Sequence, residues 1–224
     1  MIADKGELSK LLAFFVKTNG KDIYMNAQEI LARDDFKKCL AFHGHLCPGL
    51  SMGYRAAVAG MAYLNAKERS VDEELVVTTE TDACCADAIQ VITGCTFGKG
   101  NFIYKDYGKT AFTFFNRKTG IGVRIALKFN AFDISNRHFE LIGRIKNNTA
   151  TDNERKEFQS HHARRSKAIL EKNIDDLFSI SEVSVPIPEK ATIEKSQQCI
   201  KCNEPVMPSK LNKNKICRGC LESA

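Results

Sequence analysis

Residues 48–67 read PGLSMGYRAAVAGMAYLNAK. Apolar side chains recur in this stretch at helical spacing, at Leu50, Tyr54, Ala57, Met61 and Leu64. Such spacing places them on one face of a helix, which then packs against the rest of the protein. Pro48 suits the first helical position, because proline there loses no hydrogen bond and its backbone angle is already helical. The stretch therefore predicts a long helix with one buried face.

The segments around this helix mix both kinds of secondary structure. Four stretches predict strands: 75–80, 101–105, 110–116 and 122–129. Helical patterns fall at 7–16, 27–41, 83–93, 136–146 and 151–172. Thr151 and Glu154 form a capping box that opens the last of these helices, and His161 and His162 are expected on its exposed face. Because the strands cluster and the helices flank them, the sequence predicts an α+β fold with a mixed or antiparallel sheet.

Composition excludes several classes of protein. The chain has 224 residues, of which 43% are hydrophobic and 27% are charged, as is ordinary for a globular protein. The longest apolar stretch, 56–64, is far shorter than the roughly 18 residues that a membrane helix needs. Residues 1–5 begin no apolar region of a signal peptide, so a cytoplasmic location is expected. The net charge of +6 is weak support for nucleic-acid binding.

The nine cysteines divide the chain into two parts. The first group comprises Cys39, Cys47, Cys84, Cys85 and Cys95, and the second comprises Cys199, Cys202, Cys217 and Cys220. An X-Pro-X-Pro stretch lies between the groups and favours extended backbone. The sequence therefore predicts a main domain over 1–185, a linker over 186–196 and a small module over 197–224.

The four C-terminal cysteines have the spacing of a structural zinc site. Cys199 and Cys202 form one C-x-x-C pair, and Cys217 and Cys220 form another. Four thiolates complete a tetrahedral zinc site with no open position. The segment has too little core to fold alone, so we expect a zinc-ribbon or treble-clef-like module that zinc stabilises. Its basic side chains predict a solvated docking face, because no aromatic residue interleaves them to stack on nucleic acid.

The main domain carries a cluster of metal-ligating residues just before the long helix. Residues 42–49 read FHGHLCPG, so His43, His45 and Cys47 lie within five positions. Cys47 falls at the helix N-cap, where the helix dipole is expected to lower the pKa of its thiol. These side chains predict a metal or catalytic site. The alternative is a buried thiol beside two hydrogen-bonded histidines.

A second group of polar residues follows the predicted strand 75–80. Cys84 and Cys85 are adjacent on a helix, so they point about 100° apart and only one is expected to reach a shared centre. Further along, the Gly98-Lys99-Gly100 turn is followed by Asn101. Lys99 and Asn101 are candidates for orienting an anionic ligand, although an ordinary turn into the next strand is the alternative.

At these blocks the chain resembles the FmdE family, which is named for a component of formylmethanofuran dehydrogenase. The resemblance rests on FHGHLCPGLSMGYRAA at 42–57, on ETDACCADAIQVITGCTFGKGNFIYKDYGK at 80–109, on NRKTGIGVRI at 116–125 and on the four-cysteine tail. It implies an α+β core domain, a homodimer, and a metal-binding crevice formed by the His-Gly-His-X-Cys segment and Cys84. It also implies association with a molybdenum or tungsten enzyme that reduces carbon dioxide to a formyl group.

Together these features predict a two-domain metalloprotein. The main domain would hold zinc or iron through some of His43, His45, Cys47 and Cys84, and the tail would hold a structural zinc. Cys95 is a candidate further ligand or resolving thiol, and Asp82 is a candidate support for a ligand or a proton carrier. The alternatives are a non-catalytic accessory subunit or chaperone for a partner oxidoreductase, a nucleic-acid-binding regulator and a thiol-redox enzyme.

Overall fold

The computed structural model describes residues 26–132 and 135–223. The helix expected over 7–16 lies outside these residues. The chain forms two compact units, Met1–Glu189 and Lys190–Ala224. Within the described residues, none of the helices combines the length and the apolar character needed to cross a membrane.

A five-stranded sheet forms the centre of the first unit. Its strands are β1 (Leu75–Thr79), β2 (Phe102–Tyr104), β3 (Ala111–Asn116), β4 (Gly122–Leu127) and β5 (Phe178–Glu182), in the order β2-β1-β3-β4-β5. Strands β1 and β2 are parallel, with Val77 opposite Phe102, and every other pair is antiparallel. The mixed sheet confirms the predicted α+β class. The sequence analysis missed β5, because its sequence FSISE is short and mostly exposed.

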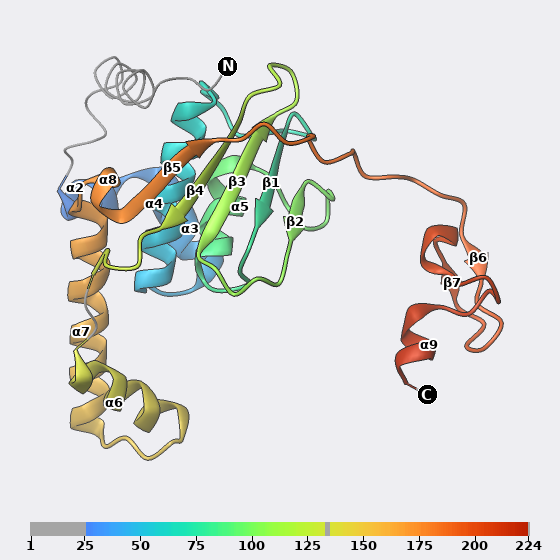
Figure 1. Cartoon of the computed structure of the whole chain (residues 1–224). Coiled ribbons are helices and arrows are strands. Elements are labelled where there is room, and N and C mark those ends of the chain that lie inside the picture. The colour runs from blue at the N-terminus through green and yellow to red at the C-terminus, as the bar shows by residue number, and fades with distance from the viewer. Residues whose placement is uncertain (1–25, 133–134, 224) are drawn as a thin grey trace. The chain divides into compact units, whose positions relative to one another are not determined.

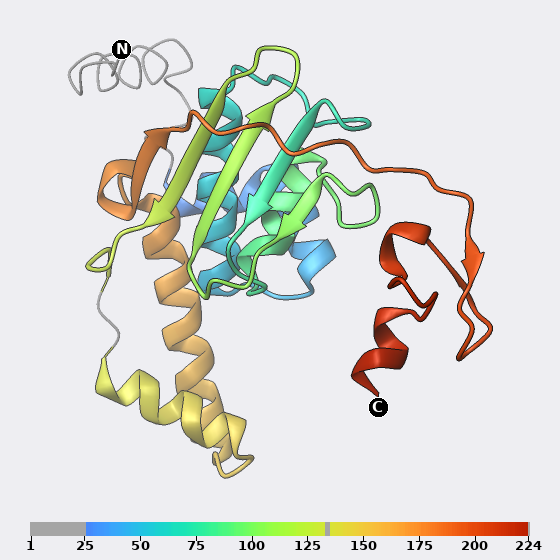
Figure 2. The same cartoon turned by 45° about the vertical axis from the view of Figure 1, so that its right-hand side comes forward.

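Helices cover one face of this sheet, as Figures 1 and 2 show for α3 (Asp34–His43), α4 (Pro48–Tyr63) and α5 (Cys85–Thr93). The side chains between them form the main core, which includes Phe112, Phe114, Val123, Ile125 and Ile89. The long helix predicted from residue 48 is confirmed, with Pro48 in its first turn and Cys47 as its N-cap. It ends at Tyr63, four residues before the predicted end.

The helix expected over 27–41 is instead two helices. Helix α2 (Ala27–Ala32) ends at Arg33, whose extended backbone then opens α3. The Arg33 guanidinium binds the Asp35 carboxylate, with Nη2 2.8 Å from Oδ2. This local ion pair accompanies the turn that separates the two helices.

Helices α4 and α5 make an unusually close contact. A Cβ atom placed on Gly53 of α4 would lie 2.2 Å from the Cys85 carbonyl oxygen, so only glycine fits there. One turn earlier, a Cβ on Gly49 would lie 2.9 Å from the Cβ of Cys84. The contact therefore brings the start of α4, with Cys47, next to the start of α5, with Cys84.

The region after β4 forms a helical hairpin of α6 (Asn136–Lys146) and α7 (Asp152–Glu171). The capping box predicted for Thr151 and Glu154 is confirmed. Helix α7 packs against α4, and the Arg55 guanidinium donates hydrogen bonds to the carbonyls of Leu170 and Lys172 at the end of α7. The short helix α8 (Ile174–Leu177) then leads into β5.

The second unit contains β6 (Gln197–Gln198) and β7 (Pro205–Val206), which pair antiparallel, followed by η1 (Pro208–Lys210) and α9 (Arg218–Glu222). Cys217 is the N-cap of α9, and its sulfur accepts a hydrogen bond from the Cys220 backbone N–H at 3.4 Å. The small amount of secondary structure is consistent with a unit organised by its cysteines.

Candidate metal centres

Three metal-ligating side chains meet between α3 and α4. Helix α3 ends at His43, and Gly44 follows with φ of 92°, a left-handed conformation that glycine adopts without strain. This turn returns the chain so that His45 and Cys47 lie beside His43. The ring centroids of His43 and His45 are 4.5 Å apart, and the ligand atoms of His43, His45 and Cys47 all lie within 4.8 Å of one another.

The orientation of His43 is fixed by Asp87 on α5. Its Nδ1 lies 2.7 Å from the Asp87 Oδ2, and its Nε2 lies 3.6 Å from the Cys47 sulfur. Because a carboxylate only accepts hydrogen bonds, Nδ1 carries the ring proton and Nε2 presents its lone pair. Histidine ligands of metals are commonly oriented in this way. A tetrahedral zinc ion separates a bound sulfur and nitrogen by about 3.6 Å, so the donor set fits a metal ion.

Sequence reasoning did not assign a role to Asp87. The signal that could have identified it is its position three residues after Cys84, since residues three apart share a helix face. Its contact with His43 joins residues 44 positions apart, and that contact is not readable without the fold.

The predicted lowering of the pKa of Cys47 is wrong for the metal-free protein. The N-cap geometry is present, since the Leu50 backbone N–H donates to the Cys47 sulfur at 3.3 Å. Burial outweighs this hydrogen bond and raises the pKa of the thiol to about 11, with a further contribution from the neighbouring Cys84. The thiol therefore stays protonated at neutral pH until a metal ion displaces its proton.

Cys84 and Cys85 have different surroundings. Cys84 is partly exposed, is the N-cap residue of α5, and lies against Gly49 beside Cys47. Cys85 is buried under α4, and this burial raises the pKa of its thiol to about 12. Cys84 is thus next to the three-residue group, although the set whose ligand atoms lie within 4.8 Å contains only His43, His45 and Cys47.

The other candidate residues of the main domain divide between the two ends of α5. Asp82 is exposed and precedes α5 at the same end as Cys84. Cys95 is fully buried after the opposite end of α5, and the nine residues of that helix span about 13 Å. The structure therefore brings Asp82 near the start of α5 and separates Cys95 from the His43 group.

Lys99 and Asn101 hold the backbone of a neighbouring loop. Lys99 Nζ donates to the carbonyls of Ser70, Val71 and Asp72, at 3.3, 3.1 and 3.0 Å. Asn101 is fully buried, and its amide donates to the carbonyls of Asp72 and Leu75 while its Oδ1 accepts from the Thr96 backbone N–H. The structure does not bring these two side chains to the His43 group.

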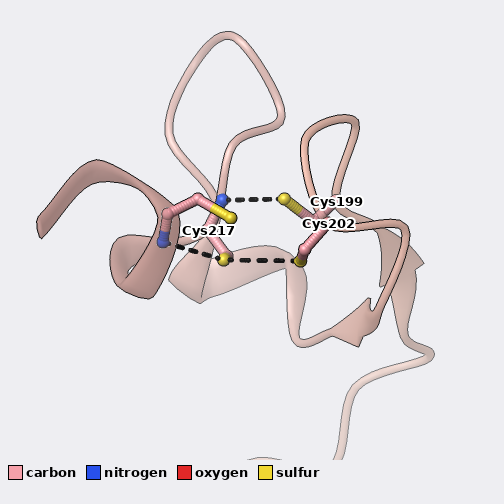
Figure 3. Close-up of side chains that lie close together, drawn as sticks. Cys199, Cys202 and Cys217 are labelled. Carbon is pink, nitrogen blue, oxygen red and sulfur yellow. Dashed lines mark hydrogen bonds between the residues drawn. The ribbon is translucent and has the colours of Figure 1, made fainter. Parts of the chain in front are cut away.

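The four cysteines of the tail form a second candidate metal centre, part of which Figure 3 shows. The ligand atoms of Cys199, Cys202, Cys217 and Cys220 all lie within 4.8 Å of one another, and all four are free thiols. The sulfurs of Cys202 and Cys217 are 3.9 Å apart (Figure 3), close to the separation of about 3.8 Å in a tetrahedral zinc–thiolate site.

Backbone N–H groups further prepare this centre for a metal ion. The Cys217 N–H donates to the Cys199 sulfur at 3.3 Å (Figure 3). Hydrogen bonds from the backbone of Cys202 and Cys217 lower the pKa of the Cys199 thiol to about 6. At neutral pH this residue is therefore a thiolate, the form that binds metals.

The fold and these two centres define an α+β protein with a His/Cys group in its core unit and a four-cysteine tail. The chain belongs to the FmdE family. The family described as "FmdE, Molybdenum formylmethanofuran dehydrogenase operon" matches residues 42–179, which include His43, His45, Cys47 and Asp87. The resemblance identified in the sequence analysis is thereby confirmed.

Two individual proteins are similar to this chain. A "Probable S-adenosyl-L-methionine-binding protein" from Archaeoglobus fulgidus is 32% identical over 190 residues, which are 81% of this chain and 51% of the relative. The chain thus spans about half the length of that curated relative. The crystal structure of an FmdE-like protein of the tungsten formylmethanofuran dehydrogenase type from Syntrophus aciditrophicus matches with a TM-score of 0.52 and 23% identity, covering 91% of this chain and 96% of the other. That match supports the shared fold.

Proposed function

We propose that this protein binds a catalytic or sensing metal ion, zinc or iron, in its core unit and a structural zinc ion in its tail. The observation that carries the proposal is the convergence of His43, His45 and Cys47, whose ligand atoms lie within 4.8 Å of one another. Three protein ligands leave a coordination position for water or a substrate. A metal ion bound there would act as a Lewis acid toward a coordinated oxygen.

The chain's own residues prepare this site in complementary ways. Asp87 holds the Nδ1 proton of His43 and so directs Nε2 toward Cys47. His45 is exposed, which leaves the group accessible to a solute. Cys84 lies beside Cys47 as a candidate fourth ligand or thiol partner, and its partial exposure gives it access to the same solute.

The experiment that tests the proposal counts metals per chain by plasma mass spectrometry after purification without chelator. The wild type should hold two metal ions. Cys47→Ser should lose the core metal and keep tail zinc, and Cys202→Ser should do the reverse. Full metal content in Cys47→Ser would contradict the assignment of the core site, and the element found in Cys202→Ser would identify the core metal.

We further propose that the protein is a metal-binding subunit for a molybdenum or tungsten oxidoreductase of the formylmethanofuran dehydrogenase type, and that it forms a homodimer. The family description, which refers to the operon of that enzyme, supports the partner. Affinity capture from a producing cell should recover a molybdenum- or tungsten-containing enzyme with the tagged chain. If the isolated chain turns over no substrate while the captured complex does, the subunit is an accessory component.

A second candidate function is the binding of S-adenosyl-L-methionine, and the Archaeoglobus fulgidus relative supports it. The similarity covers 81% of this chain, and so extends through the unit that carries the His43 group. Calorimetric titration with S-adenosyl-L-methionine, before and after removal of metal, tests this candidate. Absence of binding in both states would exclude it.

A further inference from the structure

Helix α7 brings a second set of side chains to the level of the core metal group. Figures 1 and 2 show α4 and α7 running in the same direction, and Arg55 of α4 binds the Leu170 carbonyl of α7. Cys47 precedes Arg55 by eight residues, and His162 precedes Leu170 by eight residues. Eight helical residues span about 12 Å, so His162 lies level with Cys47.

His162 belongs to a packed cluster of rings between α6 and α7. It stacks on His138 with a centroid distance of 5.1 Å and an interplanar angle of 12°, and it contacts Phe158 at 4.1 Å. His161 meets the edge of His138 at 5.7 Å. The sequence analysis expected His161 and His162 on an exposed face, but both are partly buried in this cluster.

Two polar atoms in this region are buried without a hydrogen-bond partner, His162 Nδ1 and Arg165 Nε. The two residues are three apart and therefore share a face of α7. The Arg165 guanidinium lies 4.4 Å from the centre of the Phe132 ring. Within the described part of the chain it has no acidic partner, in contrast to Arg124, which binds Glu80, and Arg137, which binds Glu157.

The charge of this region is a single positive one at neutral pH. Burial lowers the pKa of His162 to about 4, and the nearby His138, Arg165 and His45 lower it further. Burial also lowers the pKa of His138. Both imidazoles are therefore neutral, and the Arg165 guanidinium remains as an uncompensated charge beside a hydrogen-bonding imidazole. A monoanion balances this charge, whereas a phosphate dianion would not be balanced.

We propose that Arg165 and His162 form a subsite for the carboxylate of a small organic acid whose other polar end reaches the His43, His45 and Cys47 group. The planar fork of a guanidinium matches a carboxylate, and His162 Nδ1 supplies one further hydrogen bond. The electrostatic interaction between His162 and His45 shows that the two sites are neighbours. This proposal rests on the proposed metal site only for the position of the acid's second end.

Malonate is the probe that tests the subsite, because its two carboxylates can occupy both positions. It is titrated into the full chain, with and without zinc, and followed by calorimetry and by the side-chain nitrogen resonances of His162. The wild type should bind malonate in both states, more tightly with zinc. Arg165→Gln and Arg165→Met should weaken binding at least tenfold in both states with unchanged metal content, and Arg165→Met keeps the contact with Phe132.

Arg164→Gln is the matched control, since it removes the same charge one residue away, from a side chain that contacts His161. It should change malonate affinity less than twofold. Equal weakening by Arg164→Gln and Arg165→Gln, or no weakening by either Arg165 variant, would overturn the subsite. Inorganic phosphate binding more tightly than malonate, and depending equally on Arg165, would overturn the assignment to carboxylate.

Failure of the proposed metal site gives a different result. In that case the wild type would hold no core metal and zinc would not strengthen malonate binding, while the metal-free chain would still bind malonate through Arg165.

Discussion

Asp87 determines which nitrogen of His43 faces Cys47. Replacing it with Asn removes the charged acceptor, so the ring no longer has a fixed tautomer. Loss of such a partner typically weakens metal binding by about 10–100-fold. We expect Asp87→Asn to show this loss at the core site, with tail zinc unchanged, in competition titrations against a chromophoric chelator.

Asp82→Asn serves as the comparison for this prediction, because Asp82 is the carboxylate that sequence reasoning selected from the same segment. It is exposed, and we expect its replacement to leave core-metal affinity within about twofold. A larger loss in Asp82→Asn than in Asp87→Asn would reverse the two assignments.

His162 makes the stability of the protein depend on pH. Its pKa is about 4 in the folded protein and ordinarily about 6.5, so between these values only the unfolded chain takes up the proton. The contribution is complete above pH 6.5 and is lost as the pH falls toward 4. His162→Gln should therefore lose less thermal stability than the wild type between pH 7 and pH 5, measured by circular dichroism. His161→Gln, its neighbour, should not reduce this dependence, and an equal reduction by both variants would refute the prediction.

At the residue scale, the sequence predicted the parts of the site that are local. His43, His45 and Cys47 lie within five residues, so their grouping needs no fold. The raised pKa of Cys47 and the bond between His43 and Asp87 depend on burial and on packing between distant segments. Neither is encoded in a short motif.

At the scale of elements, the contact between α4 and α5 positions the core site. Gly53→Ala would place a methyl group 2.2 Å from the Cys85 carbonyl oxygen, so the helices must move apart. We expect the free energy of unfolding to fall by about 1–3 kcal/mol. Chemical denaturation measures this change, and core-metal retention should fall with it because the starts of the two helices separate.

Gly143→Ala is the matched control for this prediction. Gly143 lies within α6, and nothing occupies the space around an added Cβ. Alanine there should raise the free energy of unfolding by about 0.5–1 kcal/mol through its higher helix propensity. Destabilisation by Gly143→Ala as large as that of Gly53→Ala would show that the effect is not due to the α4–α5 contact.

Periodicity predicted the elements with strong local patterns and missed those set by tertiary contacts. Helix α4 and the first four strands follow from their apolar spacing. Strand β5 forms because β4 offers its edge, with Ile125 opposite Ile180, although the β5 sequence is weakly patterned. The division between α2 and α3 arises at Arg33, where no proline or glycine signals a break.

At the scale of the whole molecule, the two units should respond separately to metal loss. The first unit has an extensive apolar core, whereas the tail is organised around four cysteines. We expect Cys202→Ser to unfold the tail and leave the thermal unfolding of the first unit within about 2 °C of the wild type. Limited proteolysis should then cleave only within residues 190–224. Concerted loss of both units would contradict this independence.

The parallel alignment of α4 and α7 also limits where the chain can change length. Inserting or deleting one residue among 163–169 would rotate His162 by about 100° around the α7 axis and shift it by about 1.5 Å relative to Cys47. The turn at 147–150 imposes no such constraint, because α7 is anchored to α4 at its far end, through Arg55 and Leu170. Insertions and deletions are therefore expected to be tolerated in that turn and selected against in the second half of α7.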